Sequence, residues 1–556
     1  MKKILTILLL AVSLIAEADK WYIATAANGG SDTNGDGSIS APWLTLKHAC
    51  DTITGVAFVG DTIVVGEGTF TETAQSALGV GVSIYGAGET SIITSDAALN
   101  PLILLSSSTQ GTDGSQSISY LAFDGNSYTA LGAIMVDRRS NVDIHNCTFN
   151  EFGRTAAIYQ GSTSGEPTTY ATDNTFHDNT VYDCGGPWSS YGNLQIAGQQ
   201  DMLIYNNNIE QIDRGENLWG FPIKFKNNGF LKGIKIYNNK LITPAPGLSE
   251  WHIAIELWCT RGGIEIYDNE VMGKIDFGGQ IYDASNDEGG YGYNAKVYNN
   301  VIYGGHAAVD YETSGVTMER TVKGGVYIYN NLIYNVQYGI TISNLIYGNE
   351  KSDVNIYHNI IHTVGRTDGI VGAGIWVGTD SDTVTNATVS NINILNNTIV
   401  TNGGRAPRGI WLKGSLVAFD NITIRNNIVT GVVMGGANGI YLYDIVVDYV
   451  SIENNCLYDN GTDINTATAT LTNETIQNNL LATDPLFVSS SDFRLQSISP
   501  CINAGLSVGL TSDFAGHRVP QNDTVDIGAY EYGDYLFRTP SGKLLRNANG
   551  KLMITH

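Results

Sequence analysis

Short segments spread along this chain carry a polar, charged or aromatic residue between two apolar ones. In a β-strand such a residue points to the face opposite its two neighbours. In chain order these residues are Tyr159, Gln195, Lys224, Glu256, Asp276, Asp310, Thr341, Trp376, Trp411 and Tyr441. Two positions further on, some segments add Lys226, Trp258, Glu312, Lys413 or Tyr443. If the segments stack, these residues form one outward row, with charges in its middle and aromatic rings towards its C-terminal end.

The charged residues of the row could hydrolyse a glycosidic bond. Neighbouring parallel strands lie about 5 Å apart, and strands two apart are separated by about 10 Å. Glu256 with Asp276 therefore suits the short carboxylate separation of a retaining hydrolase. Glu256 with Asp310 suits the longer separation of an inverting enzyme. The alternative is a solvated sheet face on which opposite charges compensate one another.

β-Elimination on a uronic acid is a second chemistry that these residues could support. It requires a group that neutralises the substrate carboxylate and a base that removes the proton at C5. Arg261 or Ca²⁺ could do the first, and Lys224, Lys226, His252 or a tyrosine the second. Neighbouring carboxylates should raise the pKa of Lys224, and this favours His252 or a tyrosine as the base.

Oxygen donors in the same region could also bind Ca²⁺. Glu256, Asp276 and Asp310 are the expected ligands, together with backbone oxygens, because hard cations prefer oxygen. The chain has no EF-hand pattern around them. Two long insertions, Pro244–His252 and Gln280–Asn294, border the charged residues and could wall a groove.

The aromatic residues of the row predict a sugar-binding surface. Exposed aromatic side chains tend to mark binding sites, and sugars present flat C–H faces that can stack on them. We expect the substrate-binding residues to be Trp258, Trp376, Trp411, Tyr441 and Tyr443. The alternative is that loops cover these rings, which would make them ordinary packing.

The elements that would position this row are defined by a repeat. About every thirty residues the chain repeats an apolar-x-apolar strand followed by a tyrosine or similar residue, two asparagines and another apolar pair, as in IYNNNI at Ile204–Ile209. Alternating apolar residues predict strands, and paired asparagines suit a tight corner. A fixed period with strand-length units indicates a solenoid whose parallel strands pair from coil to coil.

This repeat resembles the right-handed parallel β-helix of pectate-lyase-like proteins, over roughly residues 80–490. The resemblance implies an all-β fold of about ten or more coils with a ladder of asparagines at one corner. Known members of the fold include lyases, hydrolases, epimerases, adhesins and phage tailspikes. The catalytic signatures of polygalacturonases, pectate lyases and alginate-lyase relatives are missing here, so no catalytic role is carried over from the family.

The two ends of the repeat region differ from its middle, as solenoid ends must. Residues 19–80 contain Pro42 at a predicted helix start, followed by apolar residues as far as Ile53, and we expect this helix to cap the core. The β-helix proper is expected over 81–480. Residues 481–532, with Ala482–Gly505 and Asp526–Tyr532, look like the closing segment of bacterial and phage β-helix proteins and should seal the core. The basic tail 533–556 has no assigned role.

The start of the chain predicts export. Residues 1–18 combine two lysines, an apolar run and Ala-x-Ala, which is the pattern of a secretory signal peptide. Six scattered cysteines favour buried thiols over a disulfide framework, with one or two bridges as the alternative. The net charge of −24 argues against nucleic acid and anionic membrane surfaces as partners.

Taken together, these patterns predict a secreted or cell-surface protein, monomeric or trimeric, that engages a polysaccharide along its flank. Cleavage by elimination or hydrolysis is one expectation. The competing hypothesis is a non-enzymatic adhesin, surface structural protein or tailspike-like receptor binder.

Overall fold

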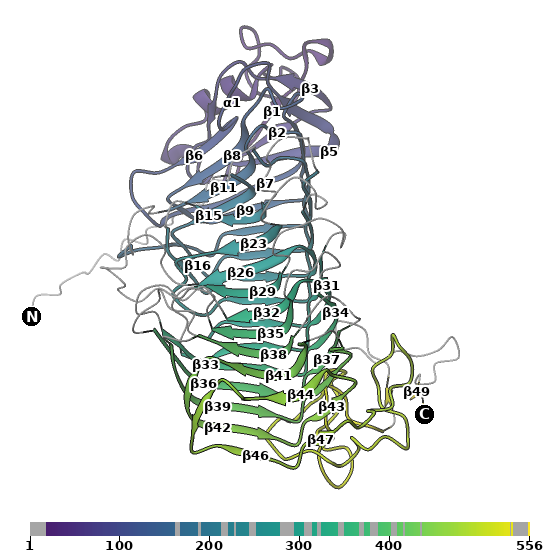
Figure 1. The fold of residues 1–556 in the computed structure, drawn as a ribbon. Helices are drawn as coiled ribbons and strands as arrows, with labels where there is room; N and C mark the ends of the chain where they lie inside the picture. Colours follow the sequence, from purple (N-terminus) through teal and green to yellow (C-terminus); the bar gives the residue numbers. More distant parts are fainter. Residues whose placement is uncertain are drawn as a thin grey trace, which may run out of the picture.

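A computed structural model describes residues 18–161, 167–186, 191–212, 221–226, 229–243, 252–278, 294–304, 314–319, 324–342, 350–365, 372–378, 387–401, 408–414, 417–433, 436–533, 535–536 and 554–555. Within them the chain winds as a stack of parallel coils (Figure 1). The predicted signal peptide and Asp310 lie outside the described residues, as do most of the insertions 244–252 and 280–294 and of the tail 533–556.

One 14-stranded parallel sheet contains the predicted row, and we call it the flank sheet. Its strands are β4 (Ser76–Ala77), β6 (Ile103–Ser106), β8 (Gly132–Asp137), β11 (Thr155–Gln160), β15 (Gly192–Ala197), β19 (Phe221–Phe225), β23 (Ile253–Leu257), β26 (Lys274–Gly278), β29 (Ser314–Glu319), β32 (Tyr338–Ile342), β35 (Ala373–Gly378), β38 (Arg408–Lys413), β41 (Asn438–Tyr443) and β44 (Thr462–Asn465).

The other large sheet has 30 strands in two adjoining columns. The first column holds β1 (Lys20–Ile23), β2 (Thr62–Val65), β5 (Ser83–Thr94), β7 (Thr112–Asp124), β9 (Arg139–His145), β13 (Thr175–His177), β17 (Leu203–Tyr205), β21 (Lys235–Tyr237), β24 (Glu265–Tyr267), β27 (Lys296–Tyr298), β30 (Val326–Tyr329), β33 (Glu350–Tyr357), β36 (Ala387–Leu395), β39 (Val417–Arg425), β42 (Val446–Glu453), β45 (Thr470–Thr472) and β46 (Thr475–Gln477).

The second column holds β3 (Gly68–Thr71), β10 (Thr148–Asn150), β14 (Thr180–Tyr182), β18 (Asn208–Glu210), β22 (Lys240–Ile242), β25 (Glu270–Met272), β28 (Val301–Tyr303), β31 (Leu332–Val336), β34 (Ile360–Val364), β37 (Thr398–Val400), β40 (Ile428–Thr430), β43 (Cys456–Tyr458) and β47 (Leu480–Leu481). A small sheet of β12 (Ala171–Thr172), β16 (Gln199–Gln200) and β20 (Leu231–Lys232) pairs three coils at another corner.

The paired asparagines explain the corner between the two columns. The first asparagine of each pair takes a left-handed conformation, as in Asn299 with φ of 56°, which asparagine tolerates better than most residues. The second is buried and bonds to the next coil. The Asn269 backbone N–H, for example, donates to Asn300 Oδ1 at 3.1 Å, and Asn300 in turn donates to the Ile266 carbonyl at 2.9 Å. The predicted asparagine ladder is therefore confirmed.

The same ladder continues towards the N-terminus without asparagine. The Cys147 backbone N–H donates to Asn179 Oδ1 at 2.9 Å, which places Cys147 at a ladder position. Inside the coils, isoleucine, valine, leucine and phenylalanine from both sheets form one continuous core along the stack. At the N-terminal end, α1 (Leu46–Thr52) buries Leu46 and Ala49 against this core, as predicted for the cap.

The segment after the last coil does not cross the end of the solenoid. It runs back along the outside of the second column, where Phe493 packs with Ile360 and Ala529, and Asn396 donates to the Asp526 carbonyl at 3.1 Å (Figure 1). In the last coil Ile476 remains 40% exposed. The predicted closing segment 481–532 therefore follows the last coil, and its described apolar side chains cover the outside of the second column.

No helix in the described part of the chain combines the length and the apolar character needed to cross a membrane.

Candidate functional site

The flank sheet brings most of the predicted row together. Strand pairing aligns Ile158, Gln195, Lys224, Glu256, Asp276, Thr317, Thr341, Trp376, Trp411 and Tyr441 as successive neighbours. Lys413 and Tyr443 are likewise paired two positions further on. The alternation of apolar residues therefore predicted correctly, for most of these strands, which side chain lies on the outward face.

One member of the row was assigned wrongly. Tyr159 points into the core, where it is fully buried and its hydroxyl donates to the Thr175 carbonyl at 2.7 Å, so Ile158 stands in the row. In this segment a second apolar alternation, shifted by one residue, fits the sequence equally well. Beside Asp276 the row continues with Thr317 of β29, and the predicted Asp310 lies outside the described residues.

The middle of the row is a buried cluster of alternating charges. Lys224 pairs with Glu256 across adjacent strands, and Lys274 Nζ lies 3.1 Å from Asp276 Oδ2 within one strand. None of the four residues is more than 7% exposed. Lys274 was not among the predicted residues, although its place two residues before Asp276 on the same strand was a signal that could have identified it.

The proton affinity of Lys224 differs from the prediction. Burial lowers its pKa to about 7, although Asp276 acts in the opposite direction. Contact with Glu256 also favours the ammonium form. The Nζ atom lies 3.9 Å from the ring centroid of Phe221 and 4.8 Å from that of Phe225, so aromatic carbon replaces water around it. Desolvation was underestimated because these two rings could not be placed from the sequence.

Three other predicted residues lie around this cluster. His252 is buried directly before β23, the strand that contains Glu256. The Trp258 ring stacks on Phe225 with centroids 5.1 Å apart. The Arg261 guanidinium lies 4.0 Å from the ring centroid of Phe230, on the side of the small sheet. The proposed role of Arg261 in neutralising a substrate carboxylate is not tested by this placement.

The aromatic part of the row forms a compact stack. Trp376 and Trp411 stack with centroids 5.5 Å apart, and Tyr338 lies 5.2 Å from Trp376. Trp376 is only 8% exposed and Trp411 only 6%, so the expectation of a fully exposed ladder is wrong for these two rings. Tyr441 is partly buried against them, and Tyr443 is 37% exposed. The accessible aromatic surface is therefore at the C-terminal end of the stack.

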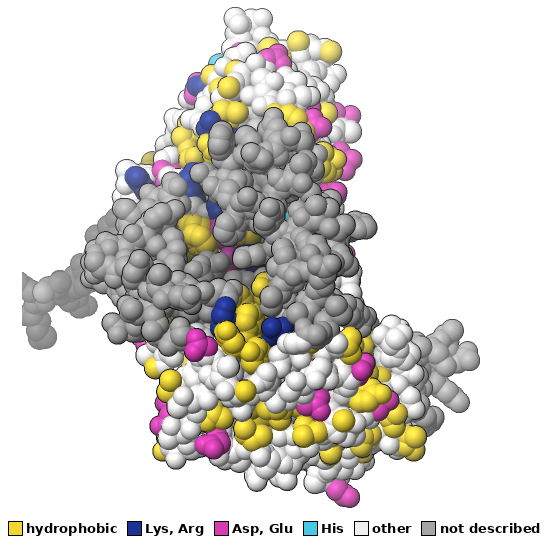
Figure 2. Space-filling model, viewed as in Figure 1, with side chains coloured by type: hydrophobic (Ala, Val, Ile, Leu, Met, Phe, Trp, Pro, Cys, Tyr) yellow, Lys and Arg dark blue, Asp and Glu magenta, His cyan; other side chains and the backbone are white. Residues whose placement is uncertain are grey.

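Two cations border this aromatic stack. The Arg408 guanidinium lies 5.3 Å from the Tyr441 ring and 5.7 Å from the Trp411 ring. Lys413 Nζ lies 5.2 Å from the Trp411 ring. Figure 2, viewed as in Figure 1, shows a hydrophobic surface with basic side chains at its borders in the region of β35, β38 and β41. Hydrogen-bond donors thus flank an apolar platform, a combination suited to a hydroxylated or acidic ring.

A second aromatic row lies on the opposite sheet, and its meaning was missed. The tyrosine of each repeat stacks on the next: Tyr205, Tyr237, Tyr267, Tyr298, Tyr329 and Tyr357 follow one another at 4.9 to 5.0 Å. Each ring covers the face of its neighbour in the next coil. We therefore assign this row a role in holding successive coils together.

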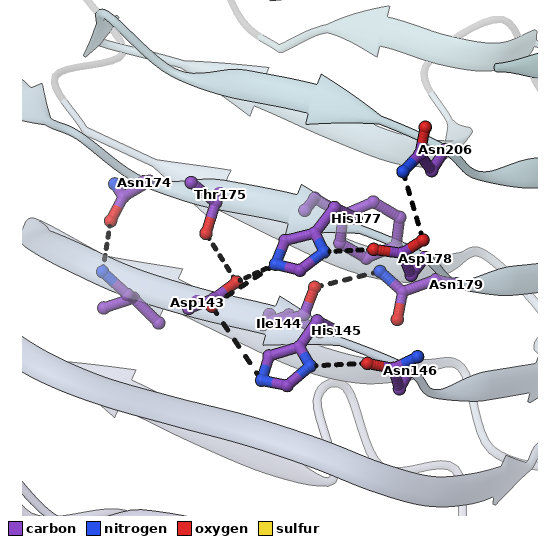
Figure 3. Close-up of polar contacts among 12 residues, drawn as sticks. Asp143, Ile144, His145, Asn146, Asn174, Thr175, His177, Asp178, Asn179 and Asn206 are labelled. Atoms are coloured by element: carbon purple, nitrogen blue, oxygen red, sulfur yellow. Dashed lines mark hydrogen bonds and ion pairs between the residues drawn. The ribbon is translucent and has the colours of Figure 1, made fainter. Parts of the chain in front are cut away.

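Two histidines continue the tyrosine row at its N-terminal end (Figure 3). His177 Nδ1 lies 2.6 Å from Asp178 Oδ2, and its Nε2 lies 3.1 Å from Asp143 Oδ1. His145 bonds to Asn146 through Nδ1 at 2.8 Å, and its Nε2 lies 3.9 Å from Asp143 Oδ2 (Figure 3). Both nitrogens of His177 therefore face carboxylates, and the ring links Asp143 of one coil with Asp178 of the next.

The predicted calcium site is not tested by the described residues. They contain no group of three or more histidine, cysteine or acidic side chains that could hold a metal ion. Glu256 and Asp276 are instead paired with lysines. The third expected ligand, Asp310, lies outside the described part of the chain.

Comparison with known proteins identifies solved structures with the same fold but no related sequence. No family model and no curated protein matches the chain. Among solved structures, a double mutant of the tailspike of E. coli bacteriophage HK620 aligns with a TM-score of 0.53 at 11% identity, covering 81% of this chain and 79% of the tailspike. The same tailspike in complex with pentasaccharide aligns at 0.51 and 11%, covering 80% and 78%. This chain is a right-handed parallel β-helix.

An alginate lyase from Paenibacillus sp. str. FPU-7 also aligns, at 15% identity and covering 72% of this chain and 99% of the lyase, but its TM-score of 0.31 is too low to support an argument. At 11% identity the tailspike likeness shows the fold alone. The roles of residues on the flank of this β-helix must therefore be argued from its own geometry.

Proposed function

We propose that this β-helix binds an extracellular polysaccharide along its flank sheet. The observation that carries the proposal is the unbroken row in which a charge cluster on β19, β23 and β26 is followed by an aromatic stack on β35, β38 and β41. A linear glycan lying along the coils would meet both in succession. Arg408 and Lys413 supply donors beside the Trp411 ring.

The comparisons support a glycan partner without establishing it. A tailspike with the same fold was solved with a pentasaccharide, which is a finding about that protein. A secreted or surface location follows from the same proposal, since such polysaccharides lie outside the cell.

We further propose that the charge cluster cleaves the bound glycan, with Lys224 as the proton-transferring group. A carboxylate paired with an ammonium group stays ionised, so Asp276 beside Lys274 is a poor general acid near neutral pH. Lys224, with its pKa lowered to about 7, has a substantial fraction of neutral amine there. This favours elimination over hydrolysis: the amine takes the C5 proton of a uronate, a C4–C5 double bond forms, and the C4 oxygen leaves.

The test is an activity screen on uronate and neutral polysaccharides, run with Ca²⁺ and with chelator. It follows the ultraviolet absorbance of unsaturated ends and, in parallel, the release of reducing ends. Elimination predicts both signals on a uronate polymer and a loss of at least about 100-fold in the Lys224→Met variant. Lys232→Met, at an exposed lysine of the small sheet, is the matched control. Reducing ends alone would establish hydrolysis and contradict the role of Lys224.

A non-enzymatic receptor binder is the second candidate, and the near-complete burial of the charge cluster favours it. Such a protein would retain glycan affinity and give neither product signal.

Glycan affinity is tested with the Trp376→Ala/Trp411→Ala double variant. We expect affinity to fall about tenfold, since each of the two lost aromatic contacts is worth about 0.5–1.5 kcal/mol. The conservative double variant with phenylalanine at both positions keeps the stack and should retain most affinity. Isothermal titration with the polymer from the screen measures both, after circular dichroism has confirmed folding. Equal affinity of the alanine variant and the parent would remove the stack from the binding site.

A further inference from the structure

Two cysteines far apart in sequence meet where the C-terminal segment crosses the second column of strands. Cys456 begins β43 in one of the last coils, and Cys501 belongs to the returning segment. Both are completely buried, and the Cys501 thiol raises the pKa of the Cys456 thiol more than any other group does. They share one apolar cluster with Ile428, Leu495 and Ile527. All six cysteines are in the thiol form in this structure.

Backbone hydrogen bonds around this pair hold the two chain segments that carry the cysteines in fixed positions. Cys456 pairs with Ile428 in the sheet, and its thiol also faces the Thr483 carbonyl at 3.2 Å. On the other side, the Ile527 N–H donates to the Cys501 carbonyl at 3.0 Å. Further along, Asn426 and Asn454 donate to the carbonyls of Leu506 and Ala504 at 2.8 and 2.9 Å. The contact between the thiols is thus part of a docked interface rather than a chance approach.

We propose that Cys456 and Cys501 form a disulfide that clamps the returning segment onto the solenoid. The step is a two-electron oxidation in which both thiols lose a proton and the S–S bond forms. The oxidant is a low-molecular-weight or protein disulfide, which is reduced to two thiols. An exported chain meets such oxidants, but the chemistry itself does not depend on the location of the protein.

The burial of the pair determines when the bond can form. The neighbouring Cys501 thiol, followed by burial, raises the pKa of Cys456, so the thiolate needed for exchange is scarce in the docked state. The side chains around the pair also exclude an oxidant. The bond therefore forms before docking is complete, and once formed it resists reduction. Oxidant must be present during folding, and adding it to the folded, reduced protein has little effect.

The experiment refolds the full chain from denaturant with oxidised glutathione, and in parallel with a reducing agent. Thiols are then titrated after denaturation, and the protein is mapped with trypsin without reduction. Cleavage at Arg425, Arg494 and Arg518 separates the two cysteines into different peptides, each of which holds no other cysteine. We expect two of the six thiols to be lost on oxidation and these two peptides to be linked.

Two comparisons make the result decisive. Oxidised protein should melt at a higher temperature than reduced protein, by at least about 2 °C, because the bond restrains the unfolded chain. Cys501→Ser should lose this difference, whereas Cys147→Ser, at a ladder position elsewhere, should keep both the link and the difference. The proposal is overturned if all six thiols remain after oxidative refolding, or if the mapped link joins other cysteines. The reduced and oxidised parent proteins suffice for this should a variant fail to fold.

Discussion

At the scale of single residues, position in the repeat decides what each side chain does. The left-handed corner position is occupied by His358 in one coil, with φ of 50°, where most coils have asparagine or aspartate. His358 is completely buried, and burial lowers its pKa from 6.5 to about 4, with Asp513 of the returning segment acting in the opposite direction. The imidazole is therefore neutral in the folded protein at pH 5, although it would be protonated in the unfolded chain.

This difference predicts a loss of stability on acidification. The folded-state pKa is depressed, so the contribution of His358 is fully present above pH 6.5 and is lost as the pH falls towards 4. Between pH 7 and pH 5 the free energy of unfolding should fall by about 2 kcal/mol from this residue alone. His358→Asn restores the common corner residue and should remove that part of the pH dependence. Urea unfolding of both proteins at the two pH values measures it, and equal pH dependence would contradict the assignment.

The sequence was informative for the outward row because most flank strands allow only one apolar alternation. Lys224, Glu256 and Trp411 were placed correctly on that basis. The assignment failed at Tyr159, because isoleucine and tyrosine are neighbours there and either could point inward. The exposure of Trp376 and the pKa of Lys224 were not predictable, because both depend on side chains from other coils that alternation does not locate.

At the scale of elements, the corner between the two columns combines two different uses of asparagine. Asn300 should tolerate substitution poorly. Its side-chain oxygen accepts from both the backbone and the side chain of Asn269, and its amide donates to the carbonyls of Ile266 and Tyr298. Asn300→Ala leaves these buried groups without partners, and we expect a loss of about 3 kcal/mol in the free energy of unfolding.

The neighbouring asparagine supplies the matched control. Asn299 takes the left-handed conformation with φ of 56°, which glycine adopts freely. Asn299→Gly should therefore cost less than about 1 kcal/mol. Denaturant unfolding of the two variants side by side tests the distinction, and similar losses in both would show that the ladder bonds contribute little.

At the scale of the whole molecule, the two ends of the core differ in how far they are covered. The helix α1 packs on the first coils, whereas the returning segment leaves the last coil open. The residues of β46 are exposed, including Ile476. In a solenoid each coil is stabilised only by its neighbours, so the coil with one neighbour should open first.

Hydrogen exchange measures this gradient. Amides of 470–481 should be protected at least about 100-fold less than those of the middle coils around β24 and β27, because local opening of the last coil exposes little new apolar surface. Mass spectrometry of peptides along the chain would resolve the two regions. Uniform protection from end to end would mean that the stack opens as a single unit.

The direction of the interactions between coils has a mechanical consequence. The strand hydrogen bonds, the asparagine ladder and the tyrosine stack all connect one coil to the next, parallel to the long axis. A pulling force along that axis acts on the interfaces between coils in series, so the weakest interface breaks first. The chain then unfolds one coil at a time. The returning segment bridges the coils from Ile360 to Cys456 and carries part of the load there in parallel. The described C-terminal third is thus a reinforced section of a rod that is otherwise held together one coil at a time.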